Sequence, residues 1–271
     1  MIYLSSFLFS RKSVRSPHIY PYNVFLNRTE KILVFAPITV LYGGNASGKS
    51  TILNIIANKL QLKGQEYATN NKFAGYFPQF INECDFTLGE DETGKSVKKV
   101  PADSRYIKSE DILYEIKKIQ QEQILADGYV YEHIRRGMPK KQREQLKNSF
   151  QMKQQMEYMK FAQEKYSNGE TTLQMLDDLI ETDALYLLDE PEVSLSPENQ
   201  TRLAEWLNKM ARFLGCQFVI ATHSPFMLAT LHAKIYNIDS RDFDVAKWTE
   251  LENVRYIYDF FMKHQKEFVQ E

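Results

Sequence analysis

The chain has 271 residues, of which 43% are apolar and 25% are charged. A chain of this composition can bury one substantial core or two modest ones, and a disordered or fibrous protein is excluded. The longest apolar runs, such as 32–42 and 218–222, fall well short of the roughly 20 residues that span a bilayer, so no integral membrane segment is expected.

The charges nearly cancel but are unevenly distributed. The net charge is −1, which gives no global reason to expect nucleic acid. Residues 95–165 carry 16 Lys plus Arg against 10 Asp plus Glu, an excess that fits either a solvated helical surface or a nucleic-acid contact. Cys84 and Cys216 lack CxxC or CxxH spacing. A disulfide framework and a zinc site are therefore not indicated, and a cytoplasmic location is expected.

The first part of the chain predicts a strand, a loop and a helix, followed by a longer helical region. Residues 1–16 turn from apolar to basic, the reverse order of a signal peptide, and they predict a first strand. An apolar run at 37–42 precedes a glycine-containing loop and a helix at 50–60. A β-like run at 73–77, a polar loop at 85–94 and a helical pattern at 104–165 follow in that order.

The last third of the chain returns to alternation of strands and helices. Helices are predicted at 172–181, at 197–213 and after Pro225, with strands at 184–188 and 217–222. Short apolar strands that alternate with helices indicate a parallel sheet covered on both faces. The predicted fold class is α/β, with a core formed by 1–94 and 171–271 and an inserted helical lobe at 95–170.

The strongest local signal is a glycine loop between the strand at 37–42 and the helix after it. Its residues are Gly43, Gly44, Asn45, Ala46, Ser47, Gly48, Lys49 and Ser50, and they fit G-x-x-x-x-G-K-[ST]. Glycine lets the backbone approach phosphates closely, and the loop amides and the helix N-terminus surround their charge. We expect Lys49 to reach the β and γ phosphates of ATP, Ser50 to ligate Mg²⁺ and Thr51 to meet the α phosphate.

Two carboxylates, Asp189 and Glu190, end the apolar run 184–188. Ligands of open α/β sheets bind at the carboxyl edge of the strands. Adjacent strand residues point to opposite faces, which suggests a division of labour between the two acids. We expect Asp189 to hold Mg²⁺, directly or through water, and Glu190 to polarise the attacking water as general base. An exposed acidic loop is the alternative.

In this order the motifs resemble those of the ABC ATPases, in the SMC/RecF-like or standalone prokaryotic branches of AAA family ATPases, over nearly the whole chain. The segment Ser167, Asn168, Gly169 and Glu170 is similar to the family signature LSGGQ in an SxGE form. The resemblance implies a P-loop NTPase fold with a mixed sheet core and an inserted helical lobe. It also implies that this segment caps the γ phosphate of ATP held by a second subunit. A plain helix N-cap at Ser167 or Asn168 is a compatible alternative.

Two further site residues are implied by the resemblance. His223 follows the strand at 217–222 and precedes a proline, where it resembles the switch histidine that contacts the γ phosphate. Gln79 follows the β-like run and takes the place of the Q-loop residue that bridges Mg²⁺ and water. Ser196 stands in the D-loop position, where many transporter subunits carry Asp.

Several residues are candidates for recognition of the nucleotide base. Relatives often stack adenine on an aromatic residue about twenty residues before the loop, and Tyr20 and Tyr22 lie near that distance. Arg28 and Asn23 are alternatives at the base edge. Because the chain contains 16 Tyr and 17 Phe, the position alone does not choose among them.

The resemblance implies an ATPase that dimerises head to tail around two ATP·Mg²⁺, because the signature segment serves a neighbouring subunit. Hydrolysis then removes the phosphate that links the halves, and the homodimer loosens. Three uses of such a switch remain open: DNA or RNA transactions such as repair or defence against mobile elements, control of a soluble protein effector, and energising a transporter. The SxGE form and the basic helical region favour the first.

Overall fold

The computed structural model of the chain describes residues 1–12, 14, 18–26, 28, 31–66, 75–90, 94–116, 118 and 168–268. The residues divide into two compact units. The first unit consists of Met1–Ser109, Ile180–Val193 and Gln200–Glu271, and the second of Glu110–Leu179 and Ser194–Asn199. Every named strand lies in the first unit, and helix α6 (Asn168–Leu179) lies in the second.

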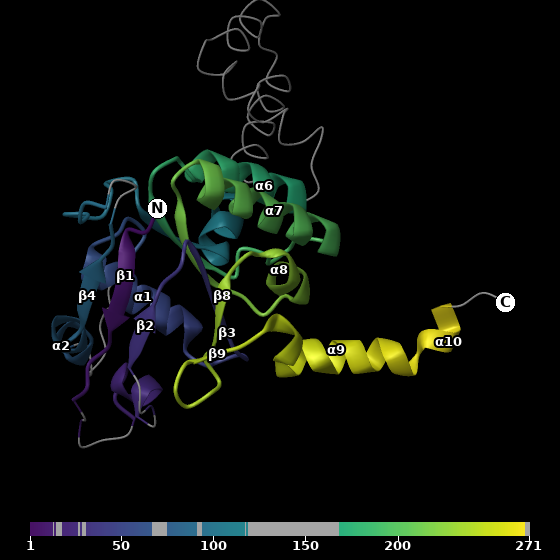
Figure 1. Ribbon diagram of the computed structural model, residues 1–271, viewed down its shortest axis with the longest axis horizontal. Coiled ribbons are helices and arrows are strands. Elements are labelled where there is room, and N and C mark those ends of the chain that lie inside the picture. Colours follow the sequence, from purple (N-terminus) through teal and green to yellow (C-terminus); the bar gives the residue numbers. More distant parts are fainter. Residues whose placement is uncertain are drawn as a thin grey trace, which may run out of the picture. The chain divides into compact units, whose positions relative to one another are not determined.

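The main sheet has six strands in the order β5-β6-β7-β3-β8-β9. They are β5 (Arg105–Lys108), β6 (Leu185–Asp189), β7 (Gln217–Ala221), β3 (Ile38–Tyr42), β8 (Lys234–Asn237) and β9 (Asp244–Val245). The first five run parallel, and β9 is antiparallel to β8. The segments that follow β3, β6 and β7 therefore leave the sheet at one edge (Figure 1).

The three central strands are buried along their whole length. Parallel strands with both faces covered bury every residue, which is why they read as continuous apolar runs in the sequence. Their observed bounds agree with the predicted strands at 37–42, 184–188 and 217–222 to within one residue at each end. The predicted α/β class with a mixed sheet is confirmed.

A smaller antiparallel sheet of three strands has the order β2-β1-β4. Its strands are β2 (Ile32–Val34), β1 (Leu4–Leu8) and β4 (Asp85–Leu88). The buried side chain of Gln217 links this sheet to the main one. Its Oε1 accepts hydrogen bonds from the backbone N–H groups of Tyr3 and Leu4 at 2.8 Å each, and its Nε2 donates to the Leu4 carbonyl at 2.8 Å. The amide thus fills backbone hydrogen-bond positions that burial would otherwise leave unpaired.

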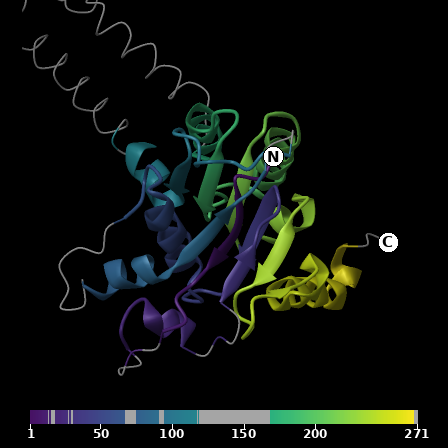
Figure 2. The same cartoon turned by 60° about the vertical axis from the view of Figure 1, so that its left-hand side comes forward.

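Helices surround the main sheet (Figures 1 and 2). The named helices of the first unit are α1 (Lys49–Leu60), α2 (Tyr76–Glu83), α7 (Pro197–Phe213), α8 (Pro225–Thr230), α9 (Glu252–Lys263) and α10 (Gln265–Phe268), with short 3-10 turns η1 (Tyr22–Phe25) and η2 (Trp248–Glu250). The first residues of α7 belong to the second unit. Helix α1 packs on β5, β6 and β7. Helices α9 and α10 extend from the sheet at its β8 side (Figure 1). Among the described helices, none combines the length and apolar character that a bilayer span requires.

The structure corrects the sequence predictions in three places. The β-like run predicted at 73–77 ends inside α2, where Phe77 and Phe80 are buried three residues apart on one helix face. The loop predicted at 85–94 begins with strand β4, whose residues are alternately exposed and half-buried. The helical pattern predicted from residue 104 begins with strand β5, in which Tyr106 and Ile107 are buried between charged ends. Short strands with polar ends carry too little apolar pattern to be recognised.

Candidate active site

The glycine loop joins the end of β3 to the start of α1. Gly48, directly before α1, has φ of +99°, and a Cβ there would lie 2.5 Å from Cγ1 of Val24. Only glycine tolerates both the left-handed backbone and that close approach. The buried Lys49 bends back over the loop, and its Nζ donates to the carbonyls of Gly43 and Gly44 at 2.8 and 3.0 Å. The loop therefore presents backbone amides, a helix N-terminus and one ammonium group together.

Asp189, the last residue of β6, is 7% exposed. Its Oδ2 accepts a hydrogen bond of 3.0 Å from the Tyr106 hydroxyl, while its Oδ1 is buried without a hydrogen-bond partner among the described residues. Burial raises the pKa of Asp189, and the nearby hydroxyls of Ser50 and Tyr106 offset only part of this rise. Such an oxygen is suited to a positively charged ligand, because a buried acceptor with no partner is costly.

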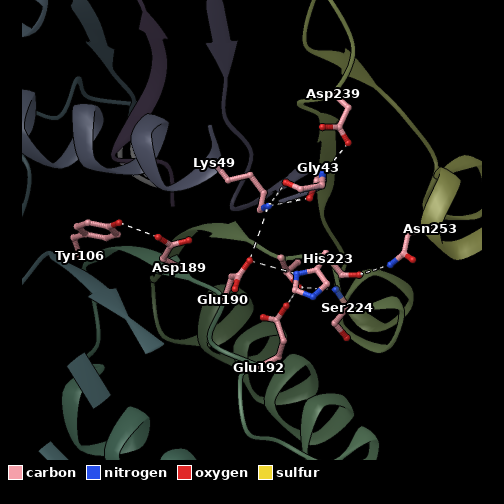
Figure 3. Close-up of polar contacts among 12 residues, drawn as sticks. Gly43, Lys49, Tyr106, Asp189, Glu190, Glu192, His223, Ser224, Asp239 and Asn253 are labelled. Carbon is pink, nitrogen blue, oxygen red and sulfur yellow. Dashed lines mark hydrogen bonds and ion pairs between the residues drawn. The ribbon is translucent and has the colours of Figure 1, made fainter. Parts of the chain in front are cut away.

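Glu190 follows Asp189 with a left-handed backbone, φ +49°. This conformation is uncommon for a residue with a Cβ and frequently marks functional sites. Its Oε1 lies 3.9 Å from Nζ of Lys49 and 3.4 Å from Nδ1 of His223, and its side chain is 31% exposed. Figure 3 shows the Glu190 carboxylate between these two groups. Unlike Asp189, it is open enough to reach water.

A third acid, Glu192, lies behind His223 and is 5% exposed. Its Oε1 makes a short hydrogen bond with the hydroxyl of Thr222, which itself accepts from the Ser224 backbone N–H at 3.0 Å. Its Oε2 is buried without a hydrogen-bond partner among the described residues. Burial raises the pKa of Glu192. The buried carboxyl group of Glu192 therefore fixes the turn that carries His223, through its hydrogen bond with Thr222.

Two more segments adjoin the site. Asp239, which follows β8, accepts a hydrogen bond of 2.8 Å from the Gly44 backbone N–H. The first turn of α9 reaches the site through Asn253, whose backbone N–H donates to the Tyr42 hydroxyl at 3.1 Å and whose Nδ2 donates to the His223 carbonyl at 3.4 Å. Figure 3 shows Asp239 joined to the glycine loop and Asn253 joined to the turn that carries His223. The edge of the sheet therefore gathers groups from β3, β6, β7, β8 and α9.

Residues 81–229, more than half of the chain, match the family described as "AAA domain, putative AbiEii toxin, Type IV TA system". The chain belongs to this AAA-domain family. The predicted identification as an ABC/AAA-type P-loop ATPase is confirmed. The matched range includes Asp189, Glu190 and His223 and begins after the glycine loop. No curated protein sequence matches the chain.

Solved structures resemble this AAA-domain protein at low identity. An Smc head domain from Pyrococcus furiosus, bound to the C-terminal domain of ScpA, is 14% identical with a TM-score of 0.43 and covers 97% of this chain and 100% of its own. The SMC head domain from Thermotoga maritima is 13% identical with a TM-score of 0.43, and the match covers 87% of this chain and 94% of that domain's chain. A putative metal-chelate type ABC transporter is 15% identical with a TM-score of 0.45, and the match covers 96% of this chain and 90% of the transporter chain.

The structure brings five predicted site residues to one edge of the sheet: Lys49, Ser50, Asp189, Glu190 and His223. It places Gln79 elsewhere. Gln79 lies in α2, and its Nε2 donates to Oε1 of Glu83 at 3.0 Å. Strand β5 pairs with β6 on the side away from β7, with Lys108 opposite Asp189. The expectation that Gln79 follows a strand is wrong, because the run before it ends inside α2. The role of Gln79 in bridging Mg²⁺ and water stays a prediction.

The other predicted residues have mixed outcomes. Ser167 lies outside the described residues, and Asn168 to Glu170 form the first turn of α6 in the second unit. Tyr22 is buried, with its ring centroid 4.9 Å from that of Phe80, so its face is not free to stack on a base. The Tyr20 ring stacks on Phe77 and lies near Thr51.

Three residues that hold the site were missed by the sequence reasoning. Tyr106 could not be found because its strand was read as helix. Glu192 stands in the same acidic run as Glu190, and the buried partner Thr222 that distinguishes it is distant in the chain. Asp239 carries no motif, and only the pairing of β8 with β3 brings it to Gly44.

Proposed function

We propose that the chain binds ATP·Mg²⁺ at residues 43–51 and hydrolyses it to ADP and phosphate. The observation that supports this most directly is the convergence of Lys49, Asp189, Glu190 and His223 at one sheet edge. The loop amides and the α1 N-terminus bind the phosphates. Lys49 exchanges its carbonyl partners for phosphate oxygens, which are stronger acceptors for an ammonium group.

The residues present fit a magnesium ion. Asp189 offers a buried Oδ1 that has no hydrogen-bond partner among the described residues, and the Ser50 hydroxyl is close enough to affect the Asp189 pKa. Hydroxyl and carboxylate oxygens are ligands that Mg²⁺ accepts, together with phosphate oxygens and water. When bound, the ion supplies charge stabilisation for the leaving phosphates. The Tyr106 hydroxyl orients the Asp189 carboxylate through Oδ2.

Glu190 is the group placed to act on the attacking water. Its carboxylate is partly exposed and lies on the same side as Lys49 and His223, so a water held beside the γ phosphate can donate a proton to it. His223 contacts the γ phosphate and holds Glu190 in place. We also propose that Ser167, Asn168, Gly169 and Glu170 complete a neighbouring subunit's site, with 1–94 and 171–271 in the core and 95–170 as the lobe, except that strand β5 within this range belongs to the main sheet.

The switch is proposed to serve DNA or RNA transactions, including defence against mobile elements. The basic excess of residues 95–165 supports this use, and the family description, which names a putative toxin of a toxin–antitoxin system, is compatible with defence. Salt-sensitive binding to duplex DNA, weakened by substitution of Lys140, Lys141 and Arg143, tests it. The second candidate is control of a soluble protein effector, which co-purification of a soluble partner would favour.

Phosphate release and size-exclusion chromatography test the proposed chemistry. The Glu190→Gln variant is expected to bind ATP, to hydrolyse it ~10²–10⁴-fold more slowly, and to accumulate a dimer with ATP. Glu205→Gln, an exposed change on α7, is the matched control and retains turnover. A Glu190→Gln protein that hydrolyses ATP at the wild-type rate contradicts the proposal.

A further inference from the structure

Strand β5 ends beside the candidate site with a lysine that has no part in the chemistry proposed above. Lys108, its last residue, lies directly opposite Asp189 in the parallel pairing of β5 with β6. Tyr106 lies two residues earlier on the same face of β5, and its hydroxyl donates to Oδ2 of Asp189 at 3.0 Å. Figure 3 shows Asp189 between Tyr106 and Glu190. Lys108 and Asp189 therefore share one face of the sheet, on strands about 5 Å apart.

Lys108 and His223 flank Asp189 from opposite sides. The three residues come at or after the ends of β5, β7 and β6, and β6 is the middle strand of the three. The Lys108 ammonium also reaches the surroundings of the glycine loop. Burial raises the pKa of the Tyr20 hydroxyl, and the Thr51 side chain and the charge of Lys108 act against that rise. Since Thr51 lies in the first turn of α1, the phosphate-binding end of this helix has the Lys108 charge nearby.

Lys108 is nearly buried, but its partner is not. Its Nζ forms an ion pair with Oε1 of Glu66, and the two side chains are 12% and 59% exposed. A buried ammonium group is costly without an anion beside it. An exposed carboxylate gains little from such a pair, because water solvates it almost as well. The ammonium therefore depends on the pair more than the carboxylate does, and another anion can take the place of Glu66.

Glu66 can release Lys108 without moving its own backbone. The Glu66 backbone N–H donates to Oδ1 of Asn54 at 3.0 Å. Its carbonyl accepts from Nδ2 of Asn54 and from Nδ2 of Asn58, at 3.2 and 3.0 Å. Both asparagines belong to α1, so the backbone at residue 66 stays on the helix while the carboxylate turns into solvent. Exchange of the partner of Lys108 therefore needs only side-chain rotation.

We propose that Lys108 is a second phosphate-binding lysine, whose ammonium leaves Glu66 for a phosphate oxygen of bound ATP. This inference rests on the proposed function, because it requires a triphosphate at the start of α1. A phosphate oxygen is a strong charged acceptor for an ammonium group. Inside the site it also competes less with water than the exposed carboxylate of Glu66 does. Glu66 then acts as a competitor of the nucleotide for Lys108 and lowers the affinity for ATP.

Isothermal titration of ATP with Mg²⁺ into the nucleotide-free, full-length protein tests the role of Lys108. Lys108→Met is expected to weaken ATP binding at least about tenfold, because a charge-assisted hydrogen bond is lost. Glu66→Gln is expected to tighten ATP binding roughly two- to fivefold, because the competing ion pair is gone. Lys63→Met is the matched control. Lys63 lies beside Arg105 of β5 and pairs with Asp103 at 3.1 Å, and its loss leaves ATP binding unchanged.

The opposite signs separate phosphate binding from a purely structural ion pair. A structural pair predicts that Lys108→Met and Glu66→Gln lower the free energy of unfolding alike, as urea denaturation measures, and change ATP binding in the same direction. That result overturns the proposal, as does a Lys108→Met protein that binds ATP as the wild type does. If Lys49→Ala loses affinity while Lys108→Met keeps it, only this inference fails. A wild type that binds no ATP contradicts the proposed function itself.

Discussion

The carboxylate of Glu83 and the carboxylates of the candidate site differ in how many hydrogen-bond donors surround them. Glu83 in α2 has a side chain that is 9% exposed. Its Oε2 accepts from Ser10 and Tyr22 at 2.5 and 2.9 Å, and its Oε1 accepts from Lys12 and Gln79 at 3.2 and 3.0 Å. Asp189 and Glu192 are similarly buried, but each keeps one oxygen without a hydrogen-bond partner among the described residues.

The difference appears in their proton affinities. Burial acts to raise the pKa of Glu83, but its hydrogen-bond donors outweigh that effect and lower the pKa overall. Burial raises the pKa of Asp189 and of Glu192. A carboxylate with all its donors present stabilises the fold. A carboxylate with an open oxygen destabilises the fold until a ligand arrives, which is the common trade between stability and function.

Among the substitutions that test this difference between Glu83 and Asp189, Asp189→Asn should have the largest effect on hydrolysis. Hydrolysis should fall ~10²-fold or more, because the metal loses its carboxylate ligand. Yet the ligand-free variant should unfold at a higher temperature than the wild type at pH 7–8, since the buried charge is gone. Phosphate release and differential scanning calorimetry measure the two effects. If the ligand-free variant is less stable than the wild type, the claim that the Asp189 carboxylate destabilises the ligand-free fold is wrong.

A substitution of Glu83 should act in the opposite direction. Glu83→Gln leaves donors from Ser10, Tyr22 and Lys12 with a weaker partner, and the loss of charged hydrogen bonds should lower the free energy of unfolding by about 2 kcal/mol. ATP hydrolysis per folded molecule should not change. Urea denaturation measures the loss. Glu90→Gln, an exposed change after β4, is the control and should lie within about 0.5 kcal/mol of the wild type.

The pH dependence of these two variants should have opposite signs. The folded pKa of Glu83 is lowered, so its stabilisation is present above the unfolded value of about 4.3 and is lost as the pH falls through the folded pKa. The folded pKa of Asp189 is raised, so the advantage of Asp189→Asn is full at neutral pH and vanishes as the pH falls toward about 3.9. Unfolding free energies from pH 8 to 3.5 show whether both differences shrink.

The smallest expected effect is in Tyr106→Phe, which removes the hydroxyl that orients Asp189. The Mg²⁺ concentration for half-maximal hydrolysis should rise about tenfold, as for other residues that support a metal ligand, with little change in the maximal rate. Tyr236→Phe removes a hydroxyl from β8 that bonds the Val34 carbonyl at 2.9 Å, and it should leave the Mg²⁺ dependence unchanged. An equal shift in both variants would assign the effect to general loosening of the sheet.

The parts of the site formed by residues close together in the chain were predictable from the sequence. The parts formed by contacts between residues distant in the chain were not. The glycine loop was predictable because all its constraints fall within eight residues, and β3, β6 and β7 because full burial makes them continuously apolar. The Glu83 cluster joins Ser10, Lys12 and Tyr22 to α2 from more than 60 residues away. The Tyr106 contact with Asp189 spans 83 residues. Neither leaves a periodic signal, since each depends on which strands become neighbours.

Isothermal titration of ATP with Mg²⁺ into the nucleotide-free wild type, Lys49→Ala and Lys59→Ala tests the central claim most directly. The glycine loop, the helix N-terminus and the ammonium of Lys49 should bind one ATP per chain. Lys49→Ala should weaken binding at least about tenfold, and EDTA should weaken wild-type binding as well. Lys59→Ala, at the other end of α1, should bind as the wild type does. Equal affinity in all three proteins would contradict the account.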